Sequence, residues 1–296
     1  KCTHEVIETR SAIFETENEN ALLLKTESQN LTIWKNKRPG VPYEKSHEGK
    51  LAIGYRGSVL SAIVDEKLLP DTLKEFRSFF KNVISFDMLA PQSLRKRDRK
   101  SDGSIGMSGQ RLSAFLHELG SKRQEELAQK LKIAYPHLED VFTRSLQSGW
   151  KRLSIKELYA GREIFTEAKH VNDGMLRLIA ILAELESQHE FLLFDEIENG
   201  INPELVQFVI DILTNARQQI MVTTHSPMIL NYLDDDTARE SVMYMYKSEE
   251  GKTKAIRFFD IPSLREKLTV MGPGEAFVDT NLVELADEIN SVLEAK

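Results

Sequence analysis

The segment 191–204, "FLLFDEIENGINPE", joins a short apolar run to a group of polar residues. The run 191–194 is apolar throughout, which predicts a strand that is buried on both faces. Two adjacent carboxylates, Asp195 and Glu196, follow at its carboxyl end. Ligands of open α/β sheets bind at this end of the strands. We therefore expect the pair to lie in a ligand site.

The two carboxylates suit different roles. Asp195 has the oxygen ligands that Mg²⁺ prefers, usually with waters between. Glu196, one residue further on, points differently and can act as a general base toward an attacking water. A solvated Asp-Glu pair after a strand is also common, so the neighbouring residues must decide between these interpretations.

The next predicted strand ends in a histidine. After Glu196, Asn202 is expected to cap a helix that has Pro203 at its first position. That helix leads to a second apolar run at 220–224, predicted as another buried strand, and then to His225 in "IMVTTHSP". Neighbouring parallel strands would bring Asp195, Glu196 and His225 to one edge of the sheet. An imidazole there can hydrogen-bond a terminal phosphate as its charge develops.

A glycine-containing helix start lies upstream, in "HVNDGMLRLIAIL". Asn172, Asp173 and Gly174 stand where a long apolar helix is predicted to begin. Free N–H groups and the positive dipole end make such a start a ready phosphate site, and Gly174 lets a phosphate approach the backbone. An ordinary Asn/Asp helix cap explains the same residues. Their place shortly before the carboxylate pair favours the phosphate site.

The order of these motifs resembles the C-terminal half of an ABC-class ATPase. The similarity is greatest to the heads of OLD-like and RecF-like proteins, many of them from bacterial anti-phage systems. It covers roughly residues 58–260 and is most specific at 191–227. The resemblance implies an α/β fold: an ABC-ATPase head with a largely parallel sheet, an antiparallel β subdomain and a helical lobe.

The resemblance also implies roles for the residues. Asp195 and Glu196 match the Walker B pair, with Asp195 on the metal and Glu196 catalytic, and His225 matches the catalytic switch histidine. The implied cofactors are ATP and Mg²⁺. Two further segments match parts of the family that act across a homodimer of heads. Asn172, Asp173 and Gly174 match the signature segment, which reaches a nucleotide bound mainly by the other subunit. Asn199 to Asn202 match the loop that lines the dimer interface.

Two departures from the family pattern stand out. The signature position that usually holds Ser is Asn172 here, although an Asn can still donate to a phosphate. The chain has no G-x-x-x-x-G-K-[ST] phosphate loop. The Gly-Lys-Thr at 251–253 lacks the earlier glycine, because that position is Tyr246, and is predicted to be a turn. We expect the Walker A segment to lie outside this sequence.

Hydrophobic patterning divides the chain into three predicted parts. Alternation over 10–35 predicts paired strands, and 36–50 a polar loop, so 1–57 form the β-hairpin part of the head. Helical periodicity dominates 58–135, which makes 58–149 a helical lobe. Within this lobe, "MSGQR" (107–111) resembles a transporter-type signature, but we expect it to start the helix that bears Leu112 and Phe115. Alternating strands and helices make 150–296 the C-terminal ATPase lobe.

Composition limits the function classes. The 296 residues carry a net charge of −7 and one cysteine, so overall charge gives no affinity for DNA, and a reducing cytoplasm is expected. No apolar segment is long enough for a membrane span. A basic run stands out in "SLRKRDRK": Arg95, Lys96, Arg97, Arg99 and Lys100. Such runs are usually solvated, but this one is also a candidate contact for nucleic-acid phosphates or an acidic partner.

The sequence therefore predicts an ABC-type ATPase whose ATP-dependent head dimerisation and hydrolysis switch a partner effector. The resemblance implies an effector on a separate chain, such as a nuclease, and a role in anti-phage defence. One alternative is a RecF-like DNA-repair ATPase, in which the basic run binds DNA. Another is a nucleotide-free scaffold with a degenerate site.

Overall fold

The structure is a computed structural model, and it describes residues 10–15, 21–27, 30–36, 44–50, 71–86, 90–248, 251–281, 284–286 and 288–290. The chain divides into two compact units, Lys1–Asn82 and Val83–Lys296. The three-part division drawn from the sequence remains a prediction.

The first unit contains an antiparallel sheet in the order β1-β2-β3-β4, followed by helix α2 (Asp71–Lys81). The paired strands predicted at 10–35 are confirmed as β1 (Arg10–Glu15), β2 (Ala21–Glu27) and β3 (Asn30–Asn36). The polar loop predicted at 36–50 is wrong over Glu44–Lys50, which form β4. Among the described strands, this polar strand pairs with β3 only. Its position is set by backbone pairing at a sheet edge, where charged residues are common.

The second unit is built on a parallel sheet whose described strands follow the order β10-β9-β5. β9 (Phe191–Phe194) lies between β5 (Val83–Phe86) and β10 (Gln219–Val222), with Phe194 level with Phe86 and Val222. The rings of Phe86 and Phe194 stack with centroids 5.2 Å apart, and both are buried. A mixed α/β fold with a parallel sheet, antiparallel sheets and helices is thus confirmed.

One expectation about this sheet is wrong. The strand predicted at 220–224 is not buried on both faces: in the described part of the chain β10 is an edge strand, and Met221 on it is 48% exposed. Helices dominate the described part of 58–135, as the periodicity predicts, but β5 also lies there. A four-residue apolar run cannot be told from a buried helix turn by periodicity. β5 is a strand because it pairs with β9, more than 100 residues away along the chain.

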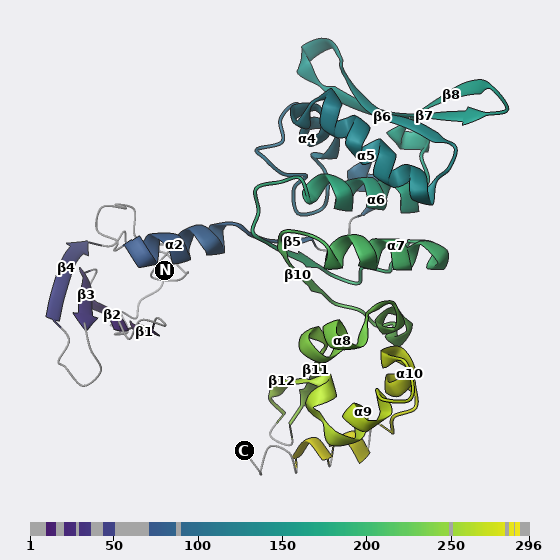
Figure 1. The fold of residues 1–296 in the computed structure, drawn as a ribbon. Helices are drawn as coiled ribbons and strands as arrows, with labels where there is room; N and C mark the ends of the chain where they lie inside the picture. Colours follow the sequence, from purple (N-terminus) through teal and green to yellow (C-terminus); the bar gives the residue numbers. More distant parts are fainter. Residues whose placement is uncertain are drawn as a thin grey trace. The chain divides into compact units, whose positions relative to one another are not determined.

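Helices and a second sheet are stacked on one another in the same unit (Figure 1). α4 (Leu112–Leu119) and α5 (Ser121–Ala134) contact the antiparallel sheet β6-β7-β8 on one side and α6 (Asp173–Glu184) on the other. The sheet comprises β6 (Leu138–Ser145), β7 (Lys151–Tyr159) and β8 (Arg162–Glu167). β6 was also expected to be part of a helical lobe. β7 and β8 form a hairpin that turns at Ala160 and Gly161, both of which have a positive φ.

Shorter helices connect these elements. α3 (Pro91–Leu94) and the 3-10 helix at Gln147–Gly149 precede β7, and the 3-10 helix at Ala168–His170 precedes α6. "MSGQR" lies in the turns directly before α4. After α7 (Pro203–Thr214) and β10 come the 3-10 helix η4 (Pro227–Tyr232) and α8 (Asp235–Ser241).

The C-terminal elements have a hydrophobic core of their own. The hairpin of β11 (Met243–Lys247) and β12 (Thr253–Arg257) confirms the predicted turn at Gly251 and Lys252, while Thr253 is already the first residue of β12. A 3-10 helix (Phe258–Asp260), α9 (Pro262–Lys267) and α10 (Pro273–Val278) follow. Phe258 and Phe259 are buried in this core. None of the described helices has the length and apolar character that a membrane crossing needs.

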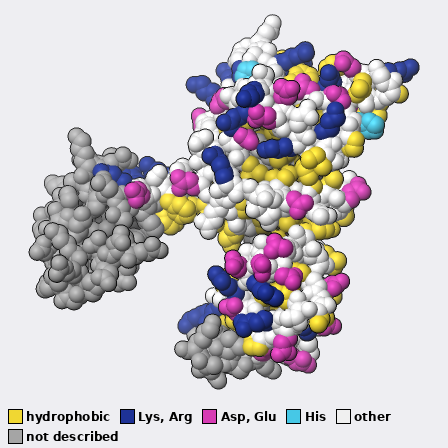
Figure 2. All heavy atoms as spheres, viewed as in Figure 1, with side chains coloured by type: hydrophobic (Ala, Val, Ile, Leu, Met, Phe, Trp, Pro, Cys, Tyr) yellow, Lys and Arg dark blue, Asp and Glu magenta, His cyan; other side chains and the backbone are white. Residues whose placement is uncertain are grey.

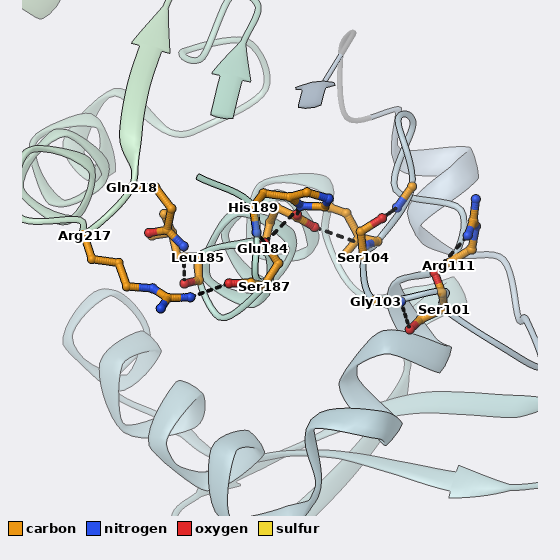
Figure 3. A network of polar contacts seen from close by, with 12 residues as sticks. Ser101, Gly103, Ser104, Arg111, Glu184, Leu185, Ser187, His189, Arg217 and Gln218 are labelled. Carbon is orange, nitrogen blue, oxygen red and sulfur yellow. Dashed lines mark hydrogen bonds and ion pairs between the residues drawn. The ribbon is translucent and has the colours of Figure 1, made fainter. Parts of the chain in front are cut away.

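Helix α6 is the most buried helix of the larger core, as its apolar sequence predicts. Its last residue, Glu184, is nevertheless acidic and fully buried. One oxygen of Glu184 accepts a hydrogen bond of 3.1 Å from the backbone N–H of Ile105, and the other lies 2.6 Å from Nδ1 of His189 (Figure 3). Nearby, the side chain of Gln218 donates to the carbonyl of Leu185. These bonds hold the 101–106 loop and the segment before β9 at the end of α6.

Replacing Glu184 with Gln should flatten the pH dependence of stability. Burial raises the pKa of Glu184 above 4.5, so the folded chain holds its proton to a higher pH than the unfolded chain does. The contribution of this group to the free energy of unfolding therefore falls as pH rises from 4.5. Urea unfolding of Glu184→Gln and wild type over a pH series measures the difference. Parallel curves would contradict this prediction, and Glu190→Gln, which alters an exposed carboxylate, is the control.

Candidate active site

The turn after β9 and the residues after β10 are joined by backbone hydrogen bonds. The parallel register sets Phe194 level with Val222, so the residues that follow each strand meet. Thr223 N–H donates to the Phe194 carbonyl (2.9 Å), and Ile197 N–H donates to the Thr223 carbonyl (3.4 Å). On the other side of β9, Asp195 N–H donates to the carbonyl of Phe86 (3.3 Å). The predicted meeting of the two strand ends is therefore present.

Thr223 fixes both residues of the carboxylate pair. Its hydroxyl oxygen accepts a hydrogen bond of 3.0 Å from the backbone N–H of Glu196, and its hydroxyl donates to Oδ1 of Asp195. Glu196 has a φ of +46°, a left-handed backbone that non-glycine residues seldom adopt. Such strain is kept only where the surroundings impose it. Thr223 is one of the residues that impose it here.

The carboxylate of Glu196 lies between two side chains. Asn199 donates through Nδ2 to Oε2, and Nε2 of His225 lies 3.1 Å from Oε1. The imidazole of His225 is 85% exposed and the side chain of Glu196 is 30% exposed. The structure thus brings Glu196, Asn199 and His225 together. A carboxylate held in this way, open to solvent, can accept a proton from a water molecule.

Asp195 offers a donor set that fits a hard cation. Its side chain is exposed, and the contact with the Thr223 hydroxyl involves only one of its oxygens. Mg²⁺ in proteins is typically bound through one or two carboxylates, with waters and substrate phosphates completing the octahedron. A single exposed carboxylate at the end of a strand is sufficient for that mode of binding.

The start of α6 lies close to the same turn. Asn172 stands at the N-cap, where its Oδ1 accepts a hydrogen bond of 2.8 Å from Met175 N–H. Asp173 is exposed and pairs with Arg95 at 2.5 Å. A Cβ on Gly174 would lie 3.2 Å from the carbonyl oxygen of Gly200. Asn172 therefore acts as a helix cap, and the amide nitrogen of its side chain is left for another contact.

Asn202 takes only part of its predicted role. Helix α7 begins with Pro203, and Asn202 holds the N-cap position, as the sequence predicts. The side chain of Asn202 forms no capping hydrogen bond within the described residues and is exposed. The start of this helix is thus fixed by Pro203 and by the backbone.

Arg177 is a site residue that carries no signal in the sequence, where it only interrupts an apolar helix. With Asp195, Glu196 and Asn199 it lines a small pocket of about 20 Å³. Its Nε is buried and has no hydrogen-bond partner in the described part of the chain. Burial lowers the pKa of Arg177, and the nearby Asp173 opposes that shift. A guanidinium so placed attracts negative charge toward the pocket.

Glu198 and Thr224 connect the residues after β9 with those after β10, and the sequence patterns did not indicate either of them. Glu198 accepts hydrogen bonds through Oε1 from the Thr224 hydroxyl (2.8 Å) and from the backbone N–H of His225 (3.1 Å). The only signal in the sequence is the pair of threonines directly before His225. Hydroxyl side chains at the end of a strand commonly bond to a neighbouring loop.

A family profile matches most of the chain. The profile is described as "AAA domain, putative AbiEii toxin, Type IV TA system", and it matches residues 14–231. The chain belongs to this AAA-domain family. No curated protein sequence matches it.

Among solved structures, this AAA domain is similar to heads of SMC ATPases, at low sequence identity. One, from work on ATP-driven dimerization and DNA-stimulated activation of SMC ATPases, has a TM-score of 0.37 and 16% identity over 49% of this chain and 88% of that chain. The SMC head domain from Thermotoga maritima has a TM-score of 0.39 and 11% identity, over 82% of this chain and 71% of that chain. An SMC head bound to the C-winged helix domain of ScpA has a TM-score of 0.45 and 13% identity, over 83% of this chain and 72% of that chain.

The basic run of the AAA domain is partly neutralised. Arg95 pairs with Asp173, Arg97 pairs with Glu167, and the guanidinium of Arg99 lies 5.0 Å from the ring centroid of Trp150. Lys96 and Lys100 are exposed, and neither forms an ion pair with a described residue. On the face drawn in Figure 2, Lys and Arg side chains are interspersed with Asp and Glu. A nucleic-acid contact through this run remains a prediction.

Replacing Gly200 with Ala should destabilise the AAA domain. Gly200 has a φ of +68°, and a Cβ there would lie 2.8 Å from the guanidinium of Arg177. The backbone strain alone costs about 1 kcal/mol, and moving Arg177 adds to it. Gly161→Ala is the matched control, because Gly161 has a φ of +79° with open space around it. Urea unfolding should show a larger loss for Gly200→Ala; equal losses would contradict a tight contact with Arg177.

Proposed function

We propose that this AAA domain is the head of an ABC-type ATPase and that it hydrolyses ATP at the ends of β9 and β10. The proposal rests on one observation: the Glu196 carboxylate is held between Asn199 and His225, directly beside the exposed carboxylate of Asp195. Membership of an AAA-domain family supports it. The resemblance of the motif order to ABC-class heads points in the same direction.

In this mechanism Glu196 orients a water molecule and takes its proton as the water attacks the terminal phosphorus. His225 is exposed and in contact with Glu196, so its imidazole can hydrogen-bond the phosphate oxygen on which charge develops. Asn199 holds Glu196 in place through Oε2. Asp195 would hold Mg²⁺, which when bound neutralises phosphate charge.

Further parts of the proposal concern a second copy of the chain. The segment 172–174 starts a buried helix, and the Nδ2 group of Asn172 forms no hydrogen bond with a described residue. We place this helix start on the ATP bound by the partner head, so that ATP closes the homodimer and hydrolysis reopens it. The cycle would switch an effector on a separate chain, such as a nuclease, in cytoplasmic anti-phage defence. The toxin–antitoxin system named in the family description is compatible with such a partner.

A RecF-like role in DNA repair is the second candidate, because Lys96 and Lys100 are exposed and have no ion-pair partner in the described part of the chain. These two roles differ in one measurable property: turnover that duplex DNA stimulates favours the DNA-repair role. If duplex DNA still stimulates turnover in the double variant Lys96→Ala/Lys100→Ala, these two lysines no longer support the DNA-repair role.

Glu196→Gln should abolish turnover and spare nucleotide binding. The amide cannot take a proton from water, so kcat should fall by about 100- to 10,000-fold, the usual contribution of a general base. The assay is phosphate release by the polypeptide expressed from its native gene, since the sequence printed here has no phosphate loop of its own. Affinity for a fluorescent ATP analogue should stay near wild type.

The matched control for this variant is Glu190→Gln, at the opposite end of β9. It should leave kcat unchanged. Turnover by Glu196→Gln at the wild-type rate would remove Glu196 from the mechanism, and the scaffold interpretation would then be favoured.

Asp195→Asn should raise the Mg²⁺ concentration needed for half-maximal turnover. An amide oxygen carries no formal charge and binds a hard cation more weakly than a carboxylate does. A Mg²⁺ titration at saturating ATP measures the shift, and excess chelator should stop the wild type completely. Asp211→Asn, on the exposed side of α7, is the control. An unchanged Mg²⁺ dependence in Asp195→Asn would place the metal elsewhere.

A further inference from the structure

Glu198 contacts the segment that carries His225 but not the reacting groups. It lies in the turn after β9, two residues beyond Glu196. Its Oε1 accepts from the Thr224 hydroxyl at 2.8 Å and from His225 N–H at 3.1 Å. The Thr224 oxygen in turn accepts from Ser226 N–H at 2.9 Å. One carboxylate oxygen thus holds the backbone on both sides of the imidazole.

Packing alone cannot hold the imidazole of His225. The side chain is 85% exposed, so few neighbours restrict its rotation or the path of its backbone. The contact of its Nε2 with Glu196 at 3.1 Å therefore depends on where the His225 backbone is anchored. The hydrogen bond from His225 N–H to Glu198 is that anchor.

The burial of Glu198 is unfavourable in free energy, so its place in the fold calls for a reason other than stability. Its second oxygen, Oε2, is buried and has no hydrogen-bond partner among the described residues. Burying a carboxylate oxygen without a partner is unfavourable, and such groups in folded proteins call for a specific reason. A positional role for the other oxygen supplies one.

We propose that Glu198 is a positioning residue that sets His225 against Glu196. It acts through the backbone of His225 and through Thr224, and it does not itself contact the phosphate or the water. The kinetic consequence rests on the proposed function. The anchoring itself does not, and it is measurable without any turnover.

A double-mutant cycle tests the kinetic consequence in the polypeptide expressed from its native gene. Glu198→Ala should lower kcat by about 10- to 100-fold, the scale of an ångström-level misplacement, with KM for MgATP little changed. In a His225→Ala background the same substitution should have almost no further effect, because the residue through which it acts is gone. An equal fold-loss of kcat in both backgrounds would overturn the proposal, since it would mean a general structural effect.

Hydrogen exchange tests the anchoring. The amide of His225 should exchange faster in Glu198→Ala, while Glu198→Gln should restore most of the protection, because its amide oxygen still accepts. Glu190→Gln should behave as wild type. Unchanged exchange at His225 in Glu198→Ala would overturn the proposal whatever the kinetics. If the wild type shows no ATP turnover, the proposed function fails, and the exchange result still decides whether Glu198 anchors His225.

Discussion

The parallel pairing of β9 with β10 is the interaction on which the candidate site depends. Because Phe194 is level with Val222, the turn 195–200 meets residues 223–225. Hydrogen bonds then run between the two segments from backbone and side chains alike. A shift of one residue in this register would turn the side chains of the strand to the opposite face and separate Glu196 from His225.

Helix α6 connects this edge to the rest of the core. Its first turn lies against Gly200, and Arg177 on its second turn lines the pocket beside Asp195. At its other end, the buried Glu184 holds the 101–106 loop and the segment that leads into β9. One helix therefore fixes both the start of the central strand and the surroundings of the residues that follow it. The three consecutive residues 223–225 complete the arrangement: Thr223 orients the carboxylate pair, Thr224 and the His225 backbone bond to Glu198, and the His225 side chain meets Glu196.

Local sequence patterns predicted the elements around the site because those patterns are strong. The apolar run at 191–194, the amphipathic helix after Pro203 and the histidine after the next apolar run are all visible along the chain. β4 and β5 were missed because each is a strand through pairing with a partner, not through its own alternation. The exposure of β10 was missed for a related reason. A run of apolar residues does not show whether its strand lies at the centre or at the edge of a sheet.

The side-chain contacts of the site were harder to predict than its location. Asp195, Glu196 and His225 were found from their positions at strand ends. Other site residues act on partners that are distant along the chain. Thr223 and Glu198 do so through hydrogen bonds, and Arg177 lines the pocket. No spacing rule connects 177 with 195 or 198 with 225. Asn172 was predicted to start the buried helix and does so, but its side chain caps that helix as well. Sequence position indicated which residues meet, and only the packing of β10 and α6 indicated how they are held.

The proposed mechanism requires a nucleotide to bind at the edge formed by the ends of β9 and β10. Its most direct test is a structure of the polypeptide expressed from its native gene, bound to Mg²⁺ and a non-hydrolysable ATP analogue. We expect the terminal phosphate within hydrogen-bond reach of His225 and a metal ion on the side of Asp195, with Glu196 facing the phosphorus. A nucleotide bound away from this edge, or no bound nucleotide at saturating concentration, would contradict it.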